Sequence, residues 1–151
     1  MNKLSLTLST LSNIIDHLNL SRELYGKILK TSPEYEELLL NLFKQKEYFL
    51  NKILNEYKRL SGKEYLLNEN RTYIFQPFSL TDAAYECLVV EEKLIDLYSD
   101  ALNQDLLWEV YPLLARQRHM LKSAGKKLIE YINQFKENSI NLGDFADHEV
   151  N

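Results

Sequence analysis

The 151-residue sequence contains few of the residues that interrupt helices or cross-link a chain, with four glycines, three prolines and one cysteine. The scarcity of glycine and proline favours a few long helices over many short strands joined by turns. The single cysteine, Cys87, excludes a disulfide within the chain, and no CxxC pair is present to bind zinc. We therefore expect a cytoplasmic protein in which Cys87 is a small core residue.

The sequence also lacks the features of several functional classes. Polar residues break up the first twenty positions, which resemble neither a signal peptide nor a membrane span. The net charge is −4 and no basic cluster stands out beyond Lys126 and Lys127, so we predict no nucleic-acid binding. No phosphate-binding loop or Ser/His/Asp set is present, and we predict no catalytic and no cofactor-binding residues.

Apolar residues at helical spacing predict a single all-α domain over residues 1–135. The four predicted helices span about 6–30, 32–60, 79–102 and 106–135. Ser32 and Pro33 are typical of a helix start, whereas Pro112 is expected in the second turn of the fourth helix, where a proline can introduce a kink. Residues 136–151 have no apolar stripe, and we expect them to form a flexible C-terminal tail.

The connection between the second and third predicted helices, residues 62–79, is unusually long for a compact domain. Fully extended, it reaches roughly 55–60 Å. A helix of about 24 residues is only about 36 Å long. The connection can therefore cross the full length of a helical bundle and leave the second and third helices parallel.

A carboxylate, Glu91, stands at the centre of the apolar face of the third predicted helix. A buried carboxylate is costly unless a cation, a metal or hydrogen-bond donors meet it. Lys46 and Gln117 occupy the corresponding centres of the second and fourth helices. We predict a polar core of Lys46, Glu91 and Gln117, in which Lys46 pairs with Glu91 and Gln117 adds a hydrogen bond. Alternatively, Lys46 extends along the apolar face to solvent and never reaches Glu91.

The first and second helical pairs look like two copies of one unit. With a shift of 73 or 71 residues, four core positions correspond: Leu18 with Glu91, Tyr25 with Tyr98, Lys46 with Gln117, and Phe49 with Met120. Two αα-hairpins joined by one long crossover describe the ferritin-like variant of the four-helix bundle. Over about residues 11–135, the chain resembles the ferritin-like superfamily and, within it, the rubrerythrin-like proteins.

The resemblance implies the architecture of that superfamily without its metal chemistry. Such families build a dimetal site from one Glu on each of two helices and a Glu-x-x-His on each of the other two. The corresponding positions here are Leu18, Lys46 with Phe49, Glu91, and Gln117 with Met120. Only Glu91 is a family ligand, and two divalent metals need several carboxylates and imidazoles. In an alternative register, Glu47 and His119 join Glu91 as ligands of iron or manganese, although both lie off the predicted core faces.

Five apolar residues point away from the predicted core: Tyr85, Val89, Trp108, Tyr111 and Ile129. They are either covered by the crossover or form the surface of a homodimer or another partner. The sequence thus favours a non-catalytic, metal-free ferritin-like bundle that forms a homodimer and acts as a structural or protein-interaction module. The alternative is a dimetal-carboxylate oxidoreductase or iron-handling protein. A third class, an adaptor for an amphipathic helix or a small apolar ligand, has no motif to support it.

Overall fold

The computed structural model describes residues 2–31, 37–67 and 80–147, and these residues contain helices and no strand. The elements are α1 (Lys3–Thr31), α2 (Glu37–Ser61), α3 (Leu80–Leu102), the short 3₁₀ helix η1 (Trp108–Val110) and α4 (Tyr111–Asp147). The predicted all-α class is confirmed. The predicted start of the second helix, at Ser32 and Pro33, lies outside the described residues.

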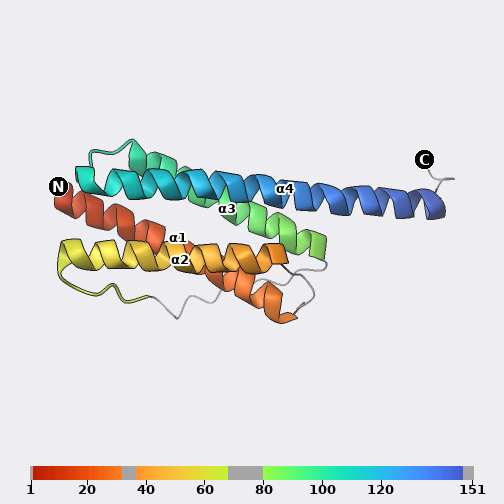
Figure 1. Cartoon of the computed structure of the whole chain (residues 1–151), viewed down its shortest axis with the longest axis horizontal. Helices are drawn as coiled ribbons and strands as arrows, with labels where there is room; N and C mark the ends of the chain where they lie inside the picture. Colours follow the sequence, from red (N-terminus) through yellow and green to blue (C-terminus); the bar gives the residue numbers. More distant parts are fainter. Residues whose placement is uncertain (1, 32–36, 68–79, 148–151) are drawn as a thin grey trace.

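The four long helices stand at the corners of a bundle. Helix α1 packs against α2 and α3, and α4 packs against α3 and α2. Figure 1 shows α1 and α4 running in one direction, with α2 and α3 running in the other. Because each helix has its two neighbours in this arrangement, α2 and α3 face each other across a diagonal of the bundle.

The described part of the long connection folds back onto the first hairpin. Gly62 ends α2 with a φ of 73°, a left-handed conformation that favours glycine. The Tyr65 hydroxyl then donates a hydrogen bond to Asp16 Oδ1 at 2.7 Å. The Tyr65 ring packs edge-on against Tyr57, with 5.2 Å between the ring centroids. Of the predicted crossover over residues 62–79, positions 68–79 lie outside the described residues.

Helix α4 differs from the prediction at both ends. It begins at Tyr111, after a non-helical segment and η1, rather than at residue 106. Pro112 is thus in the first turn, where its missing N–H costs no helical hydrogen bond, and the predicted position in the second turn is wrong. The helix also continues to Asp147, so the prediction that it ends near Phe135 is wrong. Residues 136–147 contain one glycine and no proline, and nothing in them breaks a helix.

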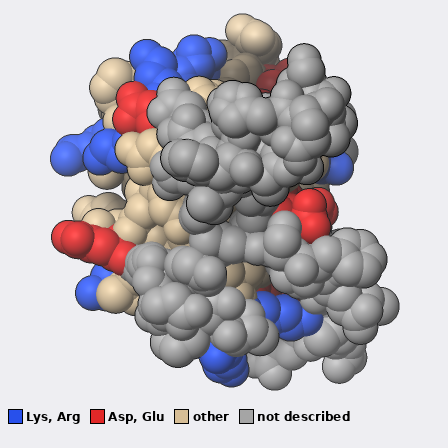
Figure 2. Space-filling model, turned by 90° about the vertical axis from the view of Figure 1, so that its right-hand side faces the viewer, with Lys and Arg blue, Asp and Glu red and all other residues tan. Residues whose placement is uncertain are grey.

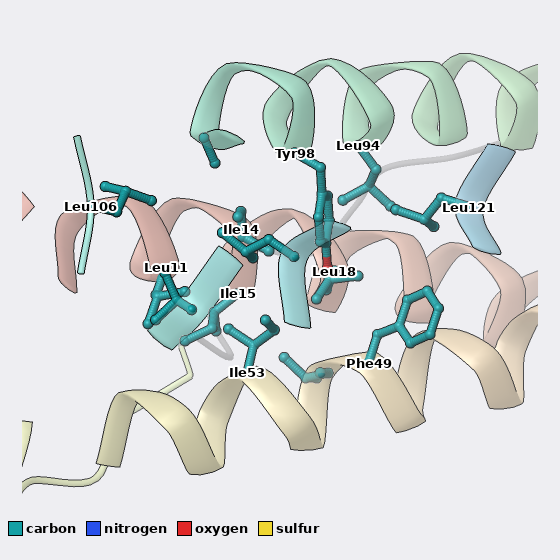
Figure 3. Packing of buried hydrophobic residues seen from close by; sticks show 14 residues of the cluster. Leu11, Ile14, Ile15, Leu18, Phe49, Ile53, Leu94, Tyr98, Leu106 and Leu121 are labelled. Atoms are coloured by element: carbon teal, nitrogen blue, oxygen red, sulfur yellow. The ribbon is translucent and has the colours of Figure 1, made fainter. Parts of the chain in front are cut away.

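The core consists of two apolar clusters that follow one another along the bundle. The first, drawn in Figure 3, contains Leu18 and Phe49, and the second contains Leu24 and Cys87. At the boundary between the clusters, three helices each place one fully buried polar residue in the interior: Ser21, Lys46 and Glu91. This boundary is the polar centre of the bundle, and it is the candidate functional site.

Candidate functional site

Lys46 and Glu91 meet at the centre of the bundle. The Lys46 Nζ lies 2.5 Å from Glu91 Oε1, and neither side chain has any exposed surface. Lys46 belongs to α2 and Glu91 to α3, so a direct contact across this diagonal places the pair on the bundle axis. The predicted ion pair is present, and the alternative in which Lys46 extends to solvent is wrong.

Further polar groups surround this pair. The Tyr25 hydroxyl donates a hydrogen bond to the same oxygen, Glu91 Oε1, at 2.6 Å. Lys46 Nζ donates to Gln45 Oε1 at 2.7 Å and lies 5.4 Å from the centroid of the Tyr25 ring. The buried charges therefore compensate each other, and both have additional polar contacts. The other carboxylate oxygen, Glu91 Oε2, is buried and has no hydrogen-bond partner among the described residues.

Gln117 belongs to a separate polar contact. The Tyr98 hydroxyl donates to Gln117 Oε1 at 2.5 Å, and Gln117 Nε2 donates to the Phe49 carbonyl at 3.4 Å. The predicted hydrogen bond from Gln117 to Glu91 is therefore wrong. Tyr98 follows Glu91 by seven residues, which is about 10 Å along α3. Gln117 lies level with the tyrosine and not with the carboxylate.

Burial changes the acid–base properties of these groups. Desolvation lowers the pKa of Lys46, although the neighbouring Glu91 acts in the opposite direction. Burial, and then the charge of Glu91, raises the pKa values of Tyr25 and Tyr98. Burial likewise raises the pKa of the Cys87 thiol. Both phenols therefore keep their protons and act as donors at neutral pH, and Cys87 stays a thiol with little nucleophilicity.

The residues at the bundle centre do not fit a dimetal site of the ferritin-like kind. Glu91 is the only carboxylate in the polar contact described above, and the Lys46 ammonium beside it repels a divalent cation. In the alternative ligand set, Glu47 is half-buried and His119 is exposed. Among residues 2–31, 37–67 and 80–134, no three His, Cys, Asp or Glu side chains are grouped so that they could hold a metal.

The predicted interface residues do not form one patch. Trp108 is 79% exposed in η1, whereas Tyr85 and Val89 are exposed in the first half of α3. Ile129 is also exposed, on α4. About 13 residues of α3, or about 20 Å, separate Val89 from the end of the helix nearest η1. Trp108 and the α3 residues are therefore distinct surfaces.

Tyr111 does not belong to either surface, and its prediction as an outward residue is wrong. Its side chain is half-buried against the first apolar cluster. Its hydroxyl accepts a hydrogen bond from the Leu106 N–H at 2.8 Å and donates one to the Gln104 carbonyl. Tyr111 therefore holds the turn between α3 and η1, a role that the helical spacing could not reveal.

Charged side chains are interspersed on the end of the bundle drawn in Figure 2. Lys and Arg side chains are scattered around its edge, with Asp and Glu side chains between them. The described residues on this face therefore show no patch of one sign, and the lack of nucleic-acid binding stays a prediction. No helix in the described part of the chain has the length and hydropathy of a membrane span.

Two features of the site had no sequence prediction. Gln45 is a polar partner of Lys46, but its position beside the core face resembles that of many surface residues. Tyr25 was identified only as the core position that corresponds to Tyr98, and helical spacing gave no acceptor for its hydroxyl, which the structure shows to be Glu91 Oε1. A search of protein-family models, curated proteins and solved structures finds no match to this sequence.

Proposed function

We propose that the protein is a metal-free, non-catalytic ferritin-like bundle that serves as a structural or protein-interaction module. The observation that carries this proposal is the fully buried pair of Lys46 and Glu91. Ferritin-like families bind their metals at the centre of the bundle, whereas this bundle centre holds the Lys46 ammonium, and Glu91 Oε1 already accepts from Lys46 and Tyr25. The parallel course of α2 and α3 in Figure 1 supports the ferritin-like topology.

Elemental analysis tests the metal-free proposal. The protein is expressed in medium supplemented with iron and manganese, purified without chelator, and analysed for both metals and for zinc. We expect less than one ion of any metal per ten chains. One or two tightly bound ions per chain would overturn the proposal and favour the dimetal oxidoreductase or iron-handling protein. In that case, loss of metal in His119→Ala would support Glu91, Glu47 and His119 as ligands.

We further propose that the chain forms a homodimer through the end of the bundle that carries Trp108. The start of α1 is fixed to the segment before η1, because Lys3 Nζ lies 3.3 Å from Asp105 Oδ1 and the Leu107 N–H donates to Thr7 Oγ1 at 3.0 Å. This end therefore presents the exposed indole close to the beginning of α1, where Leu4 is also exposed. Exposed tryptophan is enriched in protein contacts and often dominates their energy.

Sedimentation equilibrium tests the dimer. We expect the wild-type chain to be a dimer and Trp108→Glu to be a monomer, because the charge cannot be buried in an apolar contact. Val89→Glu is the matched control, since Val89 is 58% exposed on the other surface. It should remain a dimer. A monomeric wild type would overturn the dimer, and a monomeric Val89→Glu would assign the contact to the α3 surface instead.

A further inference from the structure

A groove of about 320 Å³ lies between α3 and α4. Leu88, Ile95 and Ile129 give it apolar walls, and Gly125 gives it space because that position of α4 has no side chain. A Cβ atom built on Gly125 would lie 3.9 Å from Ile95 Cδ1. The groove is separate from the Trp108 end of the bundle and is not needed for the proposed dimer.

The groove also borders the residue at the centre of the bundle, because Glu91 is one of its lining residues. Glu91 Oε1 faces the first hairpin, where it accepts from Lys46 and Tyr25. Glu91 Oε2 is buried and has no partner among the described residues. A buried acceptor without a donor is costly. Because Oε1 already has Lys46 and Tyr25 as partners, Oε2 is the oxygen available to a further donor.

We propose that this groove binds a small, largely apolar molecule whose neutral hydroxyl or N–H group donates a hydrogen bond to Glu91 Oε2. The donor is neutral because Lys46 already balances the charge of Glu91, and a cationic group would add an uncompensated charge at the bundle centre. The apolar body of the ligand packs against Leu88, Ile95 and Ile129. Glu91 has no exposed surface, so binding requires the half-buried Leu88 and Ile95 side chains to change rotamer.

Indole and benzofuran are matched probes for this proposal. The two molecules have nearly the same shape, but only indole carries an N–H donor. Titration calorimetry with the full chain should show that indole binds about tenfold more tightly or better, because benzofuran leaves Glu91 Oε2 without a partner. Equal binding of the two probes, or binding of neither, would overturn the proposal. An internal water would then be the partner of Glu91 Oε2.

A pair of variants on α4 locates the binding site. Gly125→Leu places a side chain in the groove and should abolish indole binding. Ser123→Leu adds the same side chain on the same helix, but Ser123 lines a different groove, between α2 and α4. It should leave the indole affinity unchanged. Thermal melting by circular dichroism confirms that both variants fold. Indole binding that persists in Gly125→Leu, or that is lost in Ser123→Leu, would contradict the assignment.

Discussion

The two helical hairpins carry corresponding tyrosines with different acceptors. Tyr25 of α1 donates to a carboxylate that is paired with a lysine, whereas Tyr98 of α3 donates to the neutral amide of Gln117. Both tyrosines are fully buried, and both hydroxyls bond to a residue on another helix. The common element is therefore a tyrosine that donates across the bundle, and the charge of its acceptor differs between the two hairpins.

The charge of the acceptor determines how much stability is lost when one partner of each contact is removed. In the charged contact, removal of one partner leaves an uncompensated charge in the interior, which costs several kcal/mol. In the neutral contact, removal of the acceptor leaves a hydroxyl group unsatisfied, which costs about 1–3 kcal/mol. The comparison therefore predicts that the charged contact of Tyr25, Lys46 and Glu91 depends more strongly on its partners than the neutral contact of Tyr98 with Gln117 does.

The largest effect is expected for Lys46→Met. The variant keeps an apolar side chain of similar length but leaves the Glu91 carboxylate without its cation. We expect the free energy of unfolding to fall by about 3–5 kcal/mol, measured by urea denaturation monitored with circular dichroism.

The double variant Lys46→Met with Glu91→Leu is the control for this loss. Replacing both charges with apolar groups should recover most of the stability, and the double-mutant cycle should give a large coupling energy. A coupling energy near zero would show that the two charges do not depend on each other. The contrast between the charged and the neutral contact would then be lost.

The ion pair could be predicted from the sequence because the period of a helix fixes which residues face the core. Lys46 and Glu91 each interrupt an apolar face, and two opposite charges buried in one core compensate each other when they meet. The predicted contact of Gln117 with Glu91 failed for a different reason. Helical spacing gives the direction in which a side chain points from its helix. It does not give the position of that side chain along the bundle axis relative to the residues of another helix.

The helix ends and the exposed surfaces could likewise be predicted only in part from helical spacing. The apolar stripes predicted four helices. The stripe of α4 ends near residue 135, whereas the helix continues to Asp147, so the helix end could not be predicted from the stripe. The outward direction of Trp108 and Val89 could be predicted, whereas the half-buried Tyr111 could not. Its contact depends on the turn at residues 103–107, which has no periodic pattern. The groove at Gly125 could not be predicted either, because its size depends on the distance between α3 and α4.

A smaller effect is expected for Gln117→Leu, which removes the acceptor of the Tyr98 hydroxyl without creating a charge. We expect a loss of about 1–3 kcal/mol in the free energy of unfolding. Adding Tyr98→Phe should recover part of the lost stability, because the hydroxyl that has no acceptor in Gln117→Leu is then also removed. If Gln117→Leu costs as much as Lys46→Met, the charge of the acceptor does not determine how strongly the protein depends on each contact.

The smallest effect is expected for alanine substitutions at two glycines, one within a helix of each hairpin. Glycine in a helix costs about 1 kcal/mol relative to alanine, so substitution by alanine is favourable where a methyl group fits. At Gly125 of α4, the nearest atom to a new Cβ would be Ile95 Cδ1 at 3.9 Å, an ordinary contact. At Gly26 of α1, a new Cβ would lie 3.3 Å from Phe43 Cε1, so the ring would have to move.

We therefore expect Gly125→Ala to raise the free energy of unfolding by up to about 1 kcal/mol, and Gly26→Ala to gain less or to lose stability. Parallel urea titrations of the two variants and the wild type measure this difference. Since the helix propensity gained is the same at both sites, the difference between the variants reports the packing alone. Equal gains would mean that Phe43 moves aside without cost and that α1 is packed no more tightly at Gly26 than α4 is at the groove.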